Sequence, residues 1–304
     1  MAVLKGTNLT KRFGKFYALN GVNMEVNHGE VYGFIGPNGA GKSTTIKILL
    51  GILKASEGEA TIFGKDAWKD AVDIHKRIAY VPGDVNLWPN LTGGEVIDLF
   101  MKLRGTLNKS RREEMIQKFN LDPSKKCRTY SKGNRQKVAL ISAFSSDAEL
   151  YILDEPTSGL DPLMEKVFQD CVAEAKAAGK SVLLSSHILS EVEKLCDKVG
   201  IIRQGKLIET GTLQELRHLT RTNLLIETKQ PIPDLEKFQG VHDLKIVRQG
   251  ISFQVDSDAL DAVLQYISQF GLLKLESSPP TLEELFMRHY QETKSISTTD
   301  GGVS

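Results

Sequence analysis

Hydrophobic residues along the chain gather in short runs, and the spacing of these runs divides the chain into regions. The continuous apolar runs at 31–36, 149–156 and 181–187 predict strands of a parallel sheet that is covered on both faces. Shorter β-rich stretches predict further strands at 3–9, 18–26, 59–64 and 77–82, and a hairpin at 199–211. Helix-like periodicity dominates from about 92 to 148, where Thr92 and Glu95 are spaced as a capping box. This order predicts an α/β domain with an inserted helical subdomain at about 87–148.

A second pattern begins after Leu219. Four strand-like stretches surround a single helical one at 258–270, and Pro279 and Pro280 precede a predicted final helix at 281–290. We therefore expect an α/β domain at 1–219 and a small α/β accessory module at 220–290. The polar tail at 291–304 is expected to be disordered.

Glycines punctuate the passage from the strand at 31–36 to the helix that follows. The stretch GPNGAGKST fits the G-x-x-x-x-G-K-[ST] pattern in the strand–turn–helix context that the pattern requires. Its backbone N–H groups and the helix N-terminus attract phosphate, Lys42 can reach the β- and γ-phosphates, and the Ser43 hydroxyl can ligate Mg²⁺. The chain is therefore predicted to bind a nucleoside triphosphate. The predicted binding residues are Gly36, Pro37, Asn38, Gly39, Ala40, Gly41, Lys42, Ser43 and Thr44.

Two acids end the apolar run LYILDEP, which we expect to lie beside the phosphate strand. At that position Asp154 can hold Mg²⁺ through water, and Glu155 can polarise the water that attacks the γ-phosphate. The alternative is that the acids only cap a helix, since Pro156 follows them.

His187 ends the next apolar strand, SVLLSSH. A lone histidine often has only a structural role. The carboxyl end of a strand in an α/β sheet is, however, where such folds bind ligand, which favours contact with the γ-phosphate.

The polar stretch YSKGNRQ at 130–136 precedes the apolar run KVALISAF. Ser131 either caps a buried helix or is offered to a ligand outside the chain.

These elements, together with SGLD at 158–161, resemble the nucleotide-binding subunit of an ABC transporter over residues 2–218. The resemblance implies a P-loop ATPase that needs ATP and Mg²⁺. It also implies a head-to-tail dimer in which Ser131 and Gly133 contact nucleotide held by the second copy, with Asp161 at that interface. Phe13 falls where the family places an aromatic that stacks on adenine, although Phe16 and Tyr17 lie close by.

The same resemblance implies work on the cytoplasmic face of the membrane, as a peripheral subunit of a separate transmembrane permease. The second module is similar to that of bacterial drug- and antibiotic-exporter subunits, which favours export over import. Leu87, Trp88 and Pro89 are candidates either for a surface that docks the permease or for core packing.

The chain departs from the family pattern at two places. Lys132 stands where the signature usually has glycine, and Asn134 where it has glutamine. Gly83-Asp84 stands where a glutamine that touches Mg²⁺ and water is expected, and glycine offers no ligand. The hypothesis that follows is that ATP turnover is slow, or that the coupling between ATP hydrolysis and the permease is altered.

Charge and cysteine content narrow the remaining alternatives. Residues 102–137 carry twelve Lys or Arg against three acids. This excess of positive charge predicts either a surface that binds phosphates or anionic lipid, or charged helices that are simply solvated. That segment keeps open a soluble ABC protein that acts on nucleic acid or ribosomes, but a single cassette without a long coiled coil argues against nucleic acid. A third alternative is a protein that binds ATP as a switch without hydrolysing it, and the presence of Glu155 argues against this alternative.

The three cysteines are widely spaced and odd in number, which predicts reduced thiols. No apolar run is long enough to span a membrane.

Overall fold

The computed structural model describes residues 1–105, 108–218, 221–247, 250–256 and 258–278. The chain forms two compact units, Met1–Thr210 and Gly211–Ser304. The division lies before the short helix α8 (Leu213–His218), whereas the sequence pattern places it after residue 219. The predicted helix at 281–290 and the tail at 291–304 lie outside the described residues.

The first unit begins with an antiparallel sheet. Its strand order is β2-β1-β4-β5. The strands are β1 (Ala2–Phe13), β2 (Phe16–Asn27), β4 (Glu57–Ile62) and the two-residue β5 (Lys65–Asp66). The predicted strands at 3–9 and 18–26 are confirmed, but both extend to meet in a hairpin at Phe13 and Phe16.

A six-stranded sheet with the order β10-β9-β3-β8-β7-β6 forms the centre of the unit. The strands are β3 (Val31–Ile35), β6 (Ile78–Val81), β7 (Leu150–Asp154), β8 (Ser181–Ser186), β9 (Lys198–Arg203) and β10 (Lys206–Thr212). The strands from β9 to β6 are parallel. The expectation that the acid-bearing strand lies beside the phosphate strand is wrong, because β8 pairs with both β3 and β7 and separates them.

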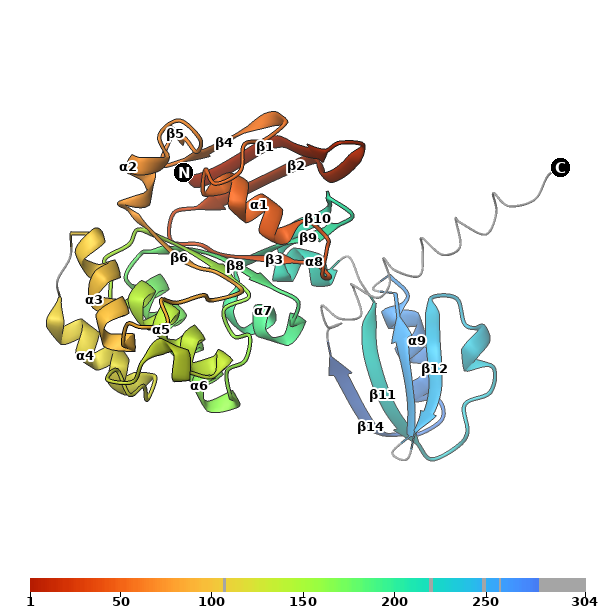
Figure 1. Ribbon diagram of the computed structural model, residues 1–304. Coiled ribbons are helices and arrows are strands. Elements are labelled where there is room, and N and C mark those ends of the chain that lie inside the picture. The colour runs from red at the N-terminus through yellow and green to blue at the C-terminus, as the bar shows by residue number, and fades with distance from the viewer. Residues whose placement is uncertain (106–107, 219–220, 248–249, 257, 279–304) are drawn as a thin grey trace. The chain divides into compact units, whose positions relative to one another are not determined.

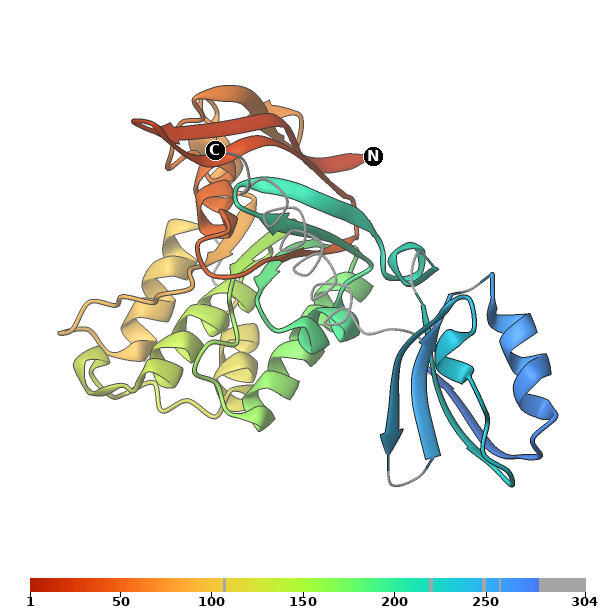
Figure 2. The same ribbon diagram turned by 90° about the vertical axis from the view of Figure 1, so that its right-hand side faces the viewer.

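Helices cover both faces of this sheet. Helix α1 (Lys42–Leu49) contacts β2, β4 and β7, and lies between the antiparallel and the parallel sheets (Figure 1). Helices α6 (Pro162–Ala177) and α7 (Leu189–Leu195) pack on the opposite face, as the turned view in Figure 2 also shows. This coverage explains why all residues of β3, β7 and β8 are buried.

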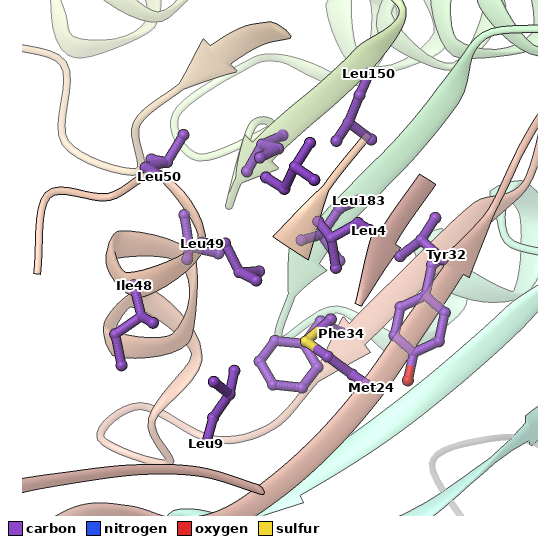
Figure 3. Close-up of a cluster of buried hydrophobic side chains, with 14 of the residues drawn as sticks. Leu4, Leu9, Met24, Tyr32, Phe34, Ile48, Leu49, Leu50, Leu150 and Leu183 are labelled. Atoms are coloured by element: carbon purple, nitrogen blue, oxygen red, sulfur yellow. The ribbon is translucent and has the colours of Figure 1, made fainter. Parts of the chain in front are cut away.

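One hydrophobic cluster joins the two sheets through α1. Phe34 and Tyr32 from β3 meet Leu4 and Met24 from the antiparallel sheet, with Leu49 of α1 beside them (Figure 3). Each of these side chains is at most 5% exposed. Burial of this size fixes the start of α1 relative to the end of β3, and thereby the turn that connects them.

The helical subdomain follows β6 and the short helix α2 (Ala71–His75). It consists of α3 (Gly93–Leu103), α4 (Lys109–Lys118), the 3₁₀ turn η1 (Cys127–Thr129) and α5 (Lys132–Phe144). The predicted capping box is confirmed, since the Thr92 side chain accepts from the Glu95 N–H and Glu95 accepts from the Thr92 N–H. Helix α5 packs on α3, α4 and β6, which ties the subdomain to the parallel sheet.

The second unit contains a four-stranded antiparallel sheet of order β12-β13-β11-β14. Its elements are β11 (Thr222–Thr228), the 3₁₀ turn η2 (Leu235–Lys237), β12 (Val241–Val247), β13 (Gly250–Val255), α9 (Leu260–Ser268) and β14 (Leu272–Ser278). Helix α9 covers one face of the sheet, where Val263 and Ile267 pack against Leu224, Ile226 and Phe253. The unit thus has a hydrophobic core of its own.

Candidate functional site

The phosphate loop lies between the end of β3 and the start of α1, held from two sides by backbone that approaches its glycines closely. A Cβ on Gly36 would lie 2.4 Å from the Ile202 carbonyl oxygen, and one on Gly41 would lie 2.9 Å from the Ala18 carbonyl oxygen. Gly41 also has a φ of 114°, which side chains rarely adopt. Both glycines are therefore required by the fold of the loop. Pro37, Asn38, Gly39 and Ala40 form the turn between them, and Ser43 and Thr44 lie in the first turn of α1.

Lys42 is buried, with 5% of its surface exposed, although it carries a charge. Its ammonium donates to the carbonyl of Gly36 at 2.6 Å and lies 3.2 Å from Oε1 of Glu155. These two acceptors offset the cost of burying the Lys42 ammonium, and phosphate oxygens can take their place. Since Ser43 beside it is exposed, both side chains fit the role of holding a triphosphate and its metal ion.

Asp154 ends β7 and is 5% exposed. The Ser185 hydroxyl donates to its Oδ1 at 2.5 Å from β8, the strand that lies between β7 and β3. The serine holds one carboxylate oxygen in place, which orients the group at the carboxyl edge of the sheet. A carboxylate there is suited to a hydrated Mg²⁺.

Glu155 follows in a left-handed backbone conformation with a φ of 46°. This conformation is uncommon for a residue with a side chain and is held by the Glu155 N–H, which donates to the Ser185 carbonyl at 3.1 Å. Oε1 of Glu155 faces Lys42, while Oε2 lies 3.2 Å from Nδ1 of His187. The three predicted side chains Lys42, Glu155 and His187 therefore form one connected chain. The alternative that the two acids cap a helix is wrong, because the next helix, α6, is capped by Asp161.

The polar stretch at 130–136 begins α5. Ser131 is the N-cap, and its side chain accepts from the Asn134 N–H at 3.3 Å, which confirms the capping interpretation. Ser131 is also exposed, and the first N–H groups of a helix have no partner within the helix. The geometry thus leaves both interpretations of this serine in force.

The first turn of α5 contacts the loop that follows Glu155. Lys132 does not extend freely into solvent, because its Nζ donates to the Ser158 hydroxyl at 2.7 Å. A Cβ on Gly133 would lie 2.4 Å from the Gly159 carbonyl oxygen, so only glycine permits this approach. Buried Gln136 donates to the Pro156 carbonyl at 2.9 Å.

Asp161 closes the same loop as the N-cap of α6. Its Oδ1 accepts from the Met164 N–H at 3.0 Å, and Pro162 occupies the first helical position. Asp161 is exposed, which is the condition for contact with a second chain.

Gly83 lies against the Mg²⁺ candidate Asp154. A Cβ at position 83 would be 3.2 Å from the Asp154 carbonyl oxygen and 3.8 Å from its Cγ. Asp84 is exposed and accepts from the Asn86 side chain at 3.3 Å. Position 83 is therefore adjacent to the site, and its missing side chain removes one possible ligand.

The aromatic candidates lie at the tip of the β1–β2 hairpin. Phe13 is 53% exposed, with Lys11 5.2 Å from its ring centroid, and Phe16 is 65% exposed. The Tyr17 hydroxyl accepts from Arg12 at 3.2 Å. Exposure alone does not choose between Phe13 and Phe16 as a base-stacking ring.

Much of the basic segment at 102–137 is neutralised within the unit. Arg112 pairs with Asp98, Lys118 pairs with Glu174, and Arg111 pairs with both Glu114 and Glu174. These pairs favour the interpretation of charged helices that stabilise one another over a free anion-binding face.

Sequence reasoning missed Ser185 and Gln136 as parts of the site. Ser185 belongs to the predicted SSH stretch, but only the strand order brings its hydroxyl to Asp154. Gln136 sits in an apolar helix and contacts a loop twenty residues away. Neither position has a local signal that predicts its partner.

Two family models and several known proteins are similar to this chain. Residues 19–158 match the model described as ABC transporter, and residues 211–290 match the C-terminal domain of ATP-binding proteins like DrrA1-3. The bacitracin transport ATP-binding protein BcrA of Bacillus licheniformis is 32% identical over 304 residues, covering 94% of this chain and 96% of that protein. The linearmycin resistance ATP-binding protein LnrL of Bacillus subtilis strain 168 is 29% identical, covering 94% and 97%.

A solved structure extends the similarity to nucleotide-bound assemblies. A dimeric ATP-binding cassette bound to ADP and Pi is 25% identical, with a TM-score of 0.63 over 69% of this chain and 98% of that one. Among the described residues of this chain, no helix is long and apolar enough to cross a membrane.

Proposed function

Because the chain belongs to the ATP-binding subunits of ABC transporters, we propose that two copies close head to tail on two ATP molecules and drive export through a separate transmembrane subunit. ATP hydrolysis is the activity of this family, and the P-loop ATPase fold is present here. The observation that carries the assignment to these residues is the chain of contacts from Lys42 through Glu155 to His187.

ATP binding would replace contacts that now lie within the loop. The β- and γ-phosphate oxygens would take the Lys42 ammonium from the Gly36 carbonyl, and the loop N–H groups would cradle the β-phosphate. Phe13, exposed at the hairpin tip, would stack on the adenine ring.

The residues present also fit Mg²⁺. The exposed Ser43 hydroxyl would ligate it directly and Asp154 through water, with Ser185 holding the Asp154 carboxylate. When bound, the ion neutralises charge that develops on the phosphate oxygens.

Hydrolysis would use Glu155 to polarise water. Lys42 now holds Oε1 of Glu155 at 3.2 Å, and a γ-phosphate that draws Lys42 away would release that oxygen to accept a proton from water. His187, 3.2 Å from the other oxygen, would contact the γ-phosphate and keep the carboxylate oriented.

The second half of each site would come from the other chain. Ser131 and the Gly133 N–H, at the exposed start of α5, would meet the partner's γ-phosphate, with Asp161 at the interface. Lys132 adds positive charge there, although in the isolated chain its ammonium is directed to Ser158.

An apolar groove between α2 and α3 supports docking of a permease. It has a volume of about 410 Å³, and residues at its rim are strongly exposed, Val72 by 77% and Leu103 by 72%. Trp88 is half exposed, and its ring centroid lies 6.1 Å from that of Phe100 in the groove lining, which supports a surface role over core packing. A cytoplasmic helix of a transmembrane subunit would fit such a groove. The lining residues are Leu50, Ile52, Val72, His75, Lys76, Ile78, Tyr80, Phe100, Leu103 and Arg104.

A substitution in the groove separates docking from catalysis. Val72→Asp is expected to abolish stimulation of ATP hydrolysis by a co-expressed transmembrane partner while leaving the rate of the isolated chain within twofold. Normal stimulation of this variant would contradict the docking assignment.

Export is supported by the relatives in bacitracin transport and linearmycin resistance and by the second unit. The location that follows is the cytoplasmic face of the membrane. RNA or DNA that stimulated the ATPase would instead support the soluble alternative.

The proposed dimer is tested by the ATPase rate per chain as a function of chain concentration. A rate that rises with concentration supports sites completed by a second copy. A rate per chain that stays constant down to concentrations at which the chain is monomeric would contradict it.

A further inference from the structure

Glu191 is a buried carboxyl group that the mechanism above does not use. It is 7% exposed, and the other buried charged side chains among the described residues, Lys42 and Asp154, belong to the site. A buried carboxyl needs hydrogen-bond partners, because its desolvation is otherwise costly. Its partners therefore indicate what it is placed to hold.

The first partner is the end of the strand that carries His187. The Ser186 hydroxyl donates to Oε2 of Glu191 at 2.9 Å. The same hydroxyl accepts from the Ile188 N–H at 2.9 Å, which ties the residue before His187 to the residue after it. Glu191 thus fixes the backbone on either side of the histidine.

The second partner is the loop that follows Glu155. The Thr157 side chain, which is 5% exposed, lies near Glu191 and lowers the pKa of its carboxyl. Thr157 accepts from the Leu160 N–H at 2.9 Å, within the turn that leads to Asp161. One carboxyl group therefore contacts both segments that bring side chains to the γ-phosphate.

We propose that Glu191 is a positioning residue that keeps His187 and the loop from Glu155 to Asp161 at a fixed separation, so that the two segments move together. The inference rests on the proposed function, since it takes His187 as a γ-phosphate contact. The 3.2 Å contact between His187 and Glu155 is the distance that this link maintains.

The electrostatic setting of Glu191 agrees with a structural acid. Burial raises the pKa of its carboxyl, while hydrogen bonds from Ser186 and Thr157 act in the opposite direction. Of the nearby charges, Glu165 raises that pKa and His187 lowers it. Glutamine has a similar shape and can still accept from the Ser186 hydroxyl, so it replaces most of the link, whereas alanine removes it.

Steady-state ATP hydrolysis by the full chain tests the link. Glu191→Ala is expected to lower kcat by about tenfold and to change KM for ATP less than twofold, because only a contact near the reacting groups is lost. Glu191→Gln should retain more than half of kcat. The control is Lys194→Ala, exposed on the same helix, which should match the unchanged chain. If Glu191→Ala does not fold, Ser186→Ala breaks the same link with a smaller cavity and should lower kcat without changing KM.

The double variant with His187→Ala decides whether Glu191 acts through the histidine. In that background Glu191→Ala should cause no further loss of kcat. A second, multiplicative loss would overturn the inference alone. A normal rate for His187→Ala by itself would instead overturn the role that the proposed function gives to His187, and the inference with it.

Discussion

The two units of this chain place their polar side chains differently. In the first unit, Lys42 follows β3 while Asp154 and Glu155 lie at the end of β7; the salt bridge between Lys42 and Glu155 joins these two segments, and Lys42 and Asp154 are buried. Among the described residues of the second unit the buried side chains are apolar, and the Arg221–Asp256–His242 ion cluster is only partly buried. Both units have a hydrophobic core, but among the described residues only the first unit also buries charged side chains.

Strand direction accounts for this difference. In a parallel sheet all carboxyl ends meet at one edge, so polar residues from distant segments converge there. In the antiparallel sheet of the second unit, successive carboxyl ends alternate between edges and cannot converge. The chemistry of this chain is therefore expected to reside entirely in Met1–Thr210.

Removal of the carboxylate of Glu155 gives the strongest test of that assignment. Glu155→Gln is expected to lower turnover by about 100-fold or more while ATP still binds, because an amide cannot accept the proton of the attacking water. The rate of ATP hydrolysis and the binding of a fluorescent ATP analogue measure the two effects. Glu227→Gln, exposed in the second unit, is the matched control and should retain the normal rate. Equal losses of turnover in both variants would contradict the assignment of catalysis to the first unit alone.

Matched core truncations test whether the units are independent. Phe34→Ala and Phe253→Ala each remove a side chain that is at most 1% exposed, and each should destabilise its own unit by ~3–5 kcal/mol. Phe34→Ala should weaken ATP binding as well, since Phe34 packs against α1 below the phosphate loop. Phe253→Ala should lower one thermal transition and leave ATP binding unchanged. Loss of ATP binding in Phe253→Ala would contradict independence.

The sequence predicted those parts of the site whose signal is local. The phosphate loop, the Thr92 capping box, the Ser131 cap and the strand ends at Asp154 and His187 each depend on a few consecutive residues. Strand order is not local, so the insertion of β8 between β3 and β7 was not predicted, and neither was the Ser185–Asp154 contact. Gln136 and Glu191 were missed for the same reason, because their partners lie far along the chain.

Position 83 tests a smaller effect within the first unit. Gly83→Gln is expected to raise turnover several-fold and to lower the Mg²⁺ concentration needed, since it adds a ligand beside Asp154. The Cβ alone would lie 3.2 Å from the Asp154 carbonyl oxygen, a tight contact that Gly83→Ala reproduces without the amide. Mg²⁺ titrations of both variants separate the two contributions. An unchanged rate and Mg²⁺ dependence in Gly83→Gln would refute the hypothesis that the missing glutamine slows the enzyme.

The smallest expected effect concerns the reactivity of the cysteines. All three cysteines lie in the first unit and are buried, so their labelling reports on the opening of that unit. Burial raises the pKa of Cys171 to about 12 and raises that of Cys196 as well, which suppresses the reactive thiolate. Labelling by a thiol reagent at pH 8 should therefore be slow in the native chain and in Phe253→Ala, and faster in Phe34→Ala. Rapid labelling of Phe253→Ala would indicate that the units unfold together.

The central claim is that each ATP site is completed by a second copy of the chain. Lys42→Ala removes the phosphate contact from a chain's own half of the site, and Ser131→Arg blocks the half that it offers to its partner. Each variant alone is expected to be inactive. In a mixed dimer both defects fall in one site and leave the other intact, so mixing the two inactive chains should restore ATP hydrolysis. A mixture that stays inactive although the chains associate would contradict the account.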